Sequence, residues 1–205
     1  MSDARSQQRD SEVGELHRSI GEFVTSFEEV CFTVHGGIVS LLQSAGLRNQ
    51  RLADVILAGM TAEPLTSLYA AIVPETQKLE VEDRKVVNNT LKRFRDLTAV
   101  RNDIVHRMCF VGGGNDQTSD WSSANRIKVH INKSGPIYKV ASRGPVELRE
   151  HVSEAIELVV LFNCFMACFI ENRPISNFVD VSTDGATSVL QKHRGATWTV
   201  PGKTK

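Results

Sequence analysis

The sequence predicts a mainly α-helical fold, an up-and-down bundle of four to five helices with a small β-hairpin inserted before the last long helix. Apolar residues recur every three to four positions over three long stretches, as they do on one face of a helix. A short alternating stretch surrounds Asn-Lys-Ser-Gly, which is typical of a hairpin. The 205 residues, 41% apolar and 23% charged, suit one globular domain with tails and argue against a disordered or fibrous chain.

The first helix is predicted from Val13 to Leu42. Its apolar positions step by three and four, so they share one face of the helix. These positions are Leu16, Ile20, Phe23, Phe27, Val30, Val34, Ile38 and Leu41. Gly46 is expected to end the helix, and the adjacent Gly36 and Gly37 are expected to allow a bend.

Two shorter helices are expected next. The first is expected to turn its apolar residues inward, and these are Leu52, Val55, Ile56 and Met60. Pro64 is expected to break the helical pattern, because proline lacks a backbone N–H and crowds the preceding turn. Another short helix is then predicted from Leu65 to Val73.

A second long helix is predicted from Glu80 to Met108, with the glycines at 112–114 ending any regular structure. Its apolar face is formed by Val87, Leu91, Phe94, Leu97 and Ile104. Alternating residues at Arg126–Ile131 and Ile137–Val140 then predict a β-hairpin over about 126–140.

The last helix is predicted from Pro145 to about Glu171 and is nearly apolar all round, so it should be buried on most sides. Glu157 and Asn163 interrupt it, and its strictly apolar runs are far shorter than the roughly 20 residues of a membrane span. We therefore expect no membrane association.

The predicted organisation is a flexible N-terminus over residues 1–12, a helical domain over 13–171 and a mostly flexible C-terminal tail over 172–205. The N-terminus has no apolar segment of the kind that exports a protein, and the four cysteines show no C-x-x-C spacing. These features predict a cytoplasmic protein with reduced thiols.

The charges balance overall but not locally. The 24 basic and 24 acidic side chains cancel, so the chain lacks the basic surplus typical of non-specific nucleic-acid binding. Residues 84–107, however, hold seven Lys or Arg against only Asp96 and Asp103. A local positive field is therefore expected in the middle of the chain.

The most informative segment lies at the end of the second long helix, where four residues separate Arg101 from His106. Arg101 continues the apolar stripe of Leu97, at a position where an apolar residue would be expected. A buried unpaired guanidinium is costly, so Arg101 should either meet a carboxylate or face a groove or interface. Asn102 and His106 share one face, and Arg101 lies about 140° from His106 around the axis, so only its long stem brings the three together.

The pattern Arg101-Asn102-x-x-x-His106 resembles the Arg-polar-x(3)-His signature of HEPN domains, a family of metal-independent ribonucleases. The order of elements over roughly residues 13–171 is also similar to the HEPN helical bundle. The resemblance implies an endoribonuclease in toxin–antitoxin, stress or antiviral defence. It further implies a homodimer with a composite site, and an antitoxin or other regulatory protein as a partner.

The chemistry of RNA cleavage suits these residue types. Histidine has a pKa near neutrality and can take the proton of a ribose 2′-hydroxyl, which makes His106 the candidate base. Arg101 can stabilise the charge that develops on phosphorus through two N–H donors, and Asn102 can orient either partner. Nearby Arg93, Arg95 and Arg107 would then attract the RNA backbone. Cys31 and His35 have the spacing of a metal-ligand pair, but no second pair matches it, and the glycines at 112–114 lack the Gly-Lys-Ser/Thr of a phosphate loop. No metal or cofactor is therefore expected.

Two other interpretations stay open. The domain could be a non-catalytic HEPN-like module that binds RNA or protein, since a site can persist for binding alone. Alternatively the motif is structural, with Arg101, His106 and Arg107 complementing the negative end of the helix dipole and Asp103 paired with Arg107.

Overall fold

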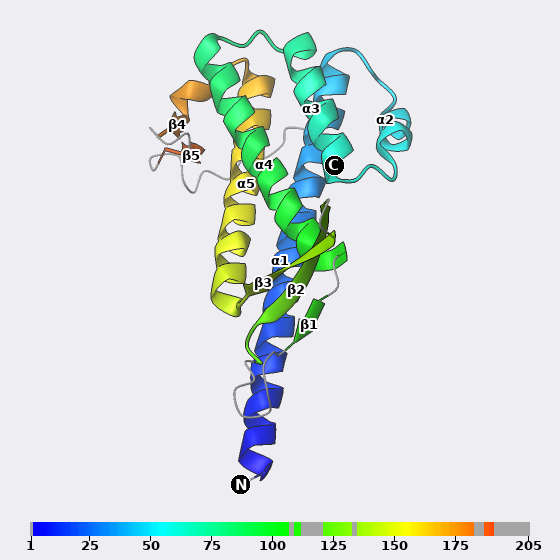
Figure 1. The fold of residues 1–205 in the computed structure, drawn as a ribbon. Coiled ribbons are helices and arrows are strands. Elements are labelled where there is room, and N and C mark those ends of the chain that lie inside the picture. Colours follow the sequence, from blue (N-terminus) through cyan, green and yellow to red (C-terminus); the bar gives the residue numbers. More distant parts are fainter. Residues whose placement is uncertain (1, 107–108, 112–120, 133–134, 183–186, 191–205) are drawn as a thin grey trace. The chain divides into compact units, whose positions relative to one another are not determined.

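A computed structural model describes residues 2–106, 109–111, 121–132, 135–182 and 187–190 of the chain (Figure 1). Within them the chain is mainly helical, and the prediction of a helical bundle with a small hairpin before the last helix is confirmed. The helices are α1 (Ser2–Ser44), α2 (Gln50–Leu57), α3 (Ala62–Thr76), α4 (Val81–His106) and α5 (Pro145–Glu171), with a short 3₁₀ helix η1 (Ile175–Asn177).

Strands β2 (Ala124–Asn132) and β3 (Gly135–Arg143) form the predicted hairpin and pair antiparallel from Ala124 opposite Arg143 to Asn132 opposite Gly135. A short strand β1 (Cys109–Val111) pairs with β2 on its other side, giving a three-stranded sheet in the order β1-β2-β3. The glycines at 112–114 and the turn residues 133–134 lie outside the described residues. Three residues are too few to show an alternating pattern, so β1 could not be predicted.

The contacts divide the chain into two compact units, each made of two segments. The first unit comprises residues 1–27 and 99–154, and the second comprises residues 28–98 and 155–205. Helices α1, α4 and α5 therefore each contribute residues to both units. The single helical domain over 13–171 stays a prediction.

Among the residues whose burial is described, the core of the first unit includes Leu16, Phe23 and Phe27 of α1 with Leu148 of α5. The rings of Phe23 and Phe27 lie on consecutive turns of α1, with centroids 6.4 Å apart. These two rings lie on the face of α1 that the three-to-four spacing predicted.

The core of the second unit is centred on aromatic rings from three helices. Phe162 of α5 packs edge-on against Tyr69, Phe94 and Phe165 at centroid distances of 5.4, 5.9 and 5.9 Å. Such edge-to-face pairs add about 0.5–1.5 kcal/mol to the stability that burial itself provides. The apolar residues predicted for this part of α1 and α4 are buried around them, and these are Val30, Val34, Ile38, Leu41, Val87, Leu91 and Leu97.

The connection from α1 to α2 follows the expected pattern. Gly46 has φ of 105°, its N–H donates to the carbonyl of Gln43, and the N–H of Leu47 donates to that of Leu42. Only glycine adopts this left-handed conformation without strain, so Gly46 ends α1 as predicted. Asn49 then caps α2 by accepting a hydrogen bond from the N–H of Leu52.

The predicted inner face of α2 is wrong. Ala53 and Leu57 are buried, whereas Leu52, Val55 and Ile56 are 46%, 70% and 48% exposed. Both sides of this helix carry apolar residues, so periodicity alone did not decide which side packs.

Pro64 does not break the helical pattern as predicted. It is the third residue of α3, which begins at Ala62. The N–H groups of a first helical turn have no partner within the helix, so proline removes no hydrogen bond there.

Both ends that the sequence predicted to be flexible contain regular elements in the described residues. Helix α1 already begins at Ser2, and the side chain of Gln8 donates to Glu12 one turn later. A long helix extends at its end without a new nucleation cost, which explains the continuation. Residues 172–190 contain η1, β4 (Val179–Val181) and β5 (Thr187–Val189), which pair antiparallel. Their buried residues are Ile175, Val179, Thr187 and Val189.

Candidate functional site

The last two turns of α4 carry Arg101, Asn102 and His106, all in the first unit. Arg101 is half-buried, and Asn102 and His106 are exposed. The helix buries Leu97 and Thr98 one turn earlier, so the site begins where the apolar stripe gives way to polar residues. Asn102 and His106 are therefore open to solvent in the described part of the chain.

The structure brings the three side chains together. One terminal nitrogen of Arg101, Nη1, lies 2.9 Å from Nε2 of His106 and 3.4 Å from Oδ1 of Asn102. The Arg101 guanidinium also lies over the ring of Phe27, with Cζ 5.8 Å from the centroid. A cation over an aromatic face is attracted by the ring's electrons, so Phe27 helps to hold the Arg101 guanidinium in place.

The contact between Arg101 and His106 restricts the histidine. Arginine only donates hydrogen bonds, so Nε2 accepts from Nη1 when it carries no proton. The imidazole is then neutral, with its proton on Nδ1. A neutral imidazole is the form that can act as a base.

The surrounding residues bear on the structural interpretation of the motif. His106 is the last residue of α4, where a cation complements the helix dipole. Asp103 is half-buried, and its predicted partner Arg107 lies outside the described residues. Helix-end chemistry alone does not account for an Arg101 that lies between an aromatic ring and a histidine.

The arginines predicted to contact RNA have different environments. Arg93, in the second unit, donates to Oε2 of Glu157 at 3.0 Å and to the carbonyl and hydroxyl of Thr187. Its side chain is only 16% exposed, so much of its donor capacity serves the fold. Arg95 is exposed. Arg107 lies outside the described residues, and all three RNA contacts stay predictions.

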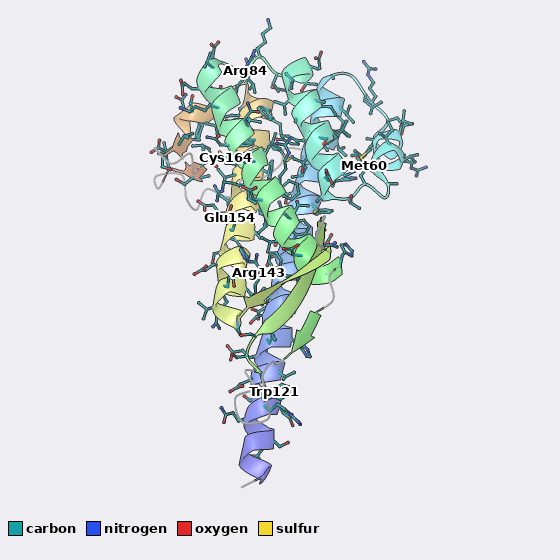
Figure 2. The ribbon with its side chains drawn as sticks, in the orientation of Figure 1. Met60, Arg84, Trp121, Arg143, Glu154 and Cys164 are labelled. Atoms are coloured by element: carbon teal, nitrogen blue, oxygen red, sulfur yellow. The ribbon has the colours of Figure 1, made fainter. Side chains whose placement is uncertain are left out.

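Sequence reasoning missed a second arginine–histidine contact in the first unit. Arg143 is the last residue of β3 and is labelled in Figure 2. It donates from Nη1 to Oε1 of Glu147 at 2.8 Å and contacts Nε2 of His151. The signal was present, since Glu147 and His151 are four residues apart on α5. The strand pairing that places Arg143 beside Glu147 and His151 cannot be read from a local sequence pattern.

The described residues include no cluster of metal-ligating side chains, and they include one helix with the length and composition of a membrane span. They contain no group of three or more His, Cys, Asp or Glu side chains that could hold a metal ion. Helix α5 is long and apolar enough to cross a membrane, and 39% of its most apolar stretch is buried. Core helices of water-soluble proteins pass the same test, and Leu158, Leu161, Phe162 and Phe165 of α5 are core residues.

No family model, no curated protein and no solved structure matches this chain. The resemblance to the HEPN family therefore rests on Arg101, Asn102 and His106 and on the order of the elements.

Proposed function

We propose that this chain is a HEPN-type metal-independent endoribonuclease whose site consists of Arg101, Asn102 and His106. The observation that carries the proposal is the 2.9 Å separation of Arg101 Nη1 and His106 Nε2 at the end of α4. It places a fixed cation beside a ring nitrogen of a histidine, a side chain that can act as a base, on the exposed part of one helix. Metal-free cleavage of a phosphodiester beside a ribose hydroxyl requires these two groups.

The reaction follows from the roles of the side chains. His106 takes the proton of the 2′-hydroxyl through Nε2, and the resulting oxygen nucleophile attacks the adjacent phosphorus. Arg101 donates to the phosphoryl oxygens as negative charge accumulates there, and Asn102 steadies its guanidinium. The bond from phosphorus to the 5′-oxygen breaks, this oxygen takes up a proton from solvent, and His106 releases to solvent the proton it accepted. The products are a 2′,3′-cyclic phosphate and a 5′-hydroxyl.

The Arg101–His106 contact also implies how substrate activates the site. In the free protein Nε2 is occupied by the Arg101 N–H. A bound phosphate is a stronger acceptor than imidazole and draws the guanidinium to itself. The released Nε2 is then available for the 2′-hydroxyl proton, so the base becomes competent only when a phosphate is present.

The remaining elements of the proposal come from the resemblance. Two copies of the chain would form a homodimer, each contributing Arg101 and His106 to a composite site. Arg95 and Arg107, and Arg93 to the extent that its fold contacts permit, would attract the RNA backbone. The protein would act in the cytoplasm in toxin–antitoxin, stress or antiviral defence, held in check by an antitoxin or another regulatory protein.

The test is cleavage of a mixed RNA pool in EDTA by the parent, His106→Ala and Arg101→Ala, with analysis of the product ends. The matched controls are His17→Ala and Arg149→Ala, which remove the same residue types from exposed positions in the first unit. We expect cyclic-phosphate products from the parent and both controls. Loss of a positioned base or cation should slow the two site variants by about 10²–10⁴-fold.

Other outcomes separate the alternatives. Unchanged cleavage by folded His106→Ala and Arg101→Ala would reject the site. RNA binding without cleavage, weakened by Arg101→Ala, would favour the non-catalytic binding module. Neither binding nor cleavage, with stability lowered by both substitutions, would favour a structural motif.

A further inference from the structure

The first unit contains a second cluster built like the proposed active site. In each case one arginine nitrogen contacts both a histidine Nε2 and a side-chain oxygen. At the end of α4 these are His106 and Asn102, and beside the start of α5 they are His151 and Glu147. The second cluster is more enclosed, because the Arg143 side chain is 18% exposed.

The two clusters share one support. The His151 ring lies against Phe23, with centroids 5.7 Å apart, and the Arg101 guanidinium lies over Phe27. Phe23 and Phe27 are adjacent on one face of α1. Both clusters therefore rest on consecutive turns of the same helix face, within a single unit.

Arg143 retains donor capacity that its described neighbours do not use. Its Nε is buried and has no hydrogen-bond partner among the described residues, while Nη1 serves Glu147 and His151. A buried N–H without a hydrogen-bond partner destabilises the folded protein. An anionic oxygen placed beside the guanidinium would satisfy it, and the edge that carries Nε binds phosphate in a forked geometry.

We propose that Arg143 and His151 form a phosphate subsite that holds a neighbouring nucleotide of the RNA strand cleaved at Arg101 and His106. The inference rests on the proposed function, since it takes RNA as the ligand. Glu147 keeps the guanidinium oriented in the free protein, as Asn102 does for Arg101. The subsite binds the strand without reacting, so it sets affinity and the register of the cleaved bond.

Protonation strengthens this subsite. Burial, together with the Arg143 charge, lowers the pKa of His151, while Glu147, Glu150 and Glu154 act in the opposite direction. His151 is therefore neutral in the free protein near pH 7. A bound phosphate favours the imidazolium and draws a proton onto it, so binding of the strand should tighten as the pH falls from 8 towards 6.

The experiment measures binding of fully 2′-O-methylated RNA, which cannot be cleaved, as a two-nucleotide strand with one phosphate and a five-nucleotide strand with four. The proteins are the parent, Arg143→Gln, Arg143→Lys and His151→Gln, each checked for folding by circular dichroism. Arg149→Ala is the control, because it removes an arginine from an exposed position of the same unit, paired only loosely with Glu15 at 3.4 Å.

We expect the longer strand to bind the parent more tightly than the shorter one. Arg143→Gln should reduce that advantage by about tenfold or more, the size of one lost charge-assisted contact. Arg143→Lys should retain only part of the affinity advantage of the longer strand. His151→Gln should abolish the pH dependence of strand binding. Arg149→Ala should stay within about twofold of the parent, as expected for a screened surface charge.

Three results would overturn the inference: no advantage for the longer strand in the parent, an advantage retained in Arg143→Gln, or an equal loss in Arg149→Ala. Because these strands are not cleavable, failure of the subsite is distinguishable from failure of the proposed function, which the cleavage assay with natural RNA reports separately. If the parent cleaves RNA and Arg143→Gln still binds the longer strand more tightly, the subsite is rejected and the proposed function is retained.

Discussion

Two adjacent glycines in α1 should have opposite effects on stability when each is replaced by alanine. A Cβ at Gly37 would lie 2.9 Å from Cε2 of Tyr69, closer than carbon atoms pack, whereas a Cβ at Gly36 meets nothing within 4 Å. The Tyr69 ring is fully buried and cannot turn away without disturbing its neighbours. Gly36→Ala should therefore stabilise the protein, and Gly37→Ala should not.

The magnitudes follow from helix propensity and packing. Replacing glycine by alanine inside a helix gains about 0.5–1 kcal/mol. At Gly37 this gain is opposed by overpacking, which costs about 1–3 kcal/mol in a close-packed core. The two variants should thus differ by about 1–3 kcal/mol in the free energy of unfolding. For a chain of this size each kcal/mol shifts Tm by about 2–4 °C.

Urea and thermal unfolding of both variants, followed by circular dichroism and fluorescence, would measure this difference. Gly37→Ala should cost less free energy of unfolding in a Tyr69→Leu background than in the parent, because the opposing ring edge is gone. A Gly37→Ala protein as stable as Gly36→Ala would refute the packing of Tyr69 against α1.

Three further predictions concern buried polar groups. Tyr69→Phe should be as stable as the parent or more so in urea unfolding, because the Tyr69 hydroxyl is buried without a hydrogen-bond partner among the described residues. Burial raises the pKa of Tyr69, so the parent, unlike Tyr69→Phe, should lose stability as pH rises above about 10, where the unfolded chain releases its proton first. The pKa of His151 is lowered from 6.5, so the unfolded chain takes up a proton first as the pH falls. Its contribution to stability should be complete above pH 6.5 and decline below it, a slope that His151→Gln should reduce in unfolding measured from pH 8 to 5. Arg93→Gln should cost about 1–3 kcal/mol by breaking the contacts to Glu157 and Thr187, whereas Arg95→Gln at an exposed position should stay within about 0.5 kcal/mol.

Long elements with one apolar face were predictable from the sequence. The stripe from Leu16 to Leu41 in α1 and the stripe through Phe94 in α4 repeat over many turns, so chance cannot mimic them. Helix α5 was also predicted closely, because Pro145 marks its start and a long, nearly apolar stretch indicates its length. Gly46 was recognised because its conformation is one that other residues avoid.

Short elements were not predictable, because their placement depends on partners distant in sequence. In α2 the choice between Val55 and Leu57 as the buried residue is made by the helices around it. Strand β5 is held through Thr187 by Arg93, a contact across 94 positions that no local pattern reveals. Likewise the motif around Arg101 was visible, whereas the cluster around Arg143 required the hairpin to bring it beside α5.

The division of the chain into interleaved units constrains how the protein can be made in a cell. Neither unit is a continuous stretch, and the first cannot close until residues 99–154 have joined residues 1–27. At usual rates of translation that interval lasts on the order of ten seconds. During it, the apolar stripe of α1 leaves the ribosome without its partners. We therefore expect the nascent chain to depend on chaperone capture, and fragments ending before α5 to aggregate rather than fold.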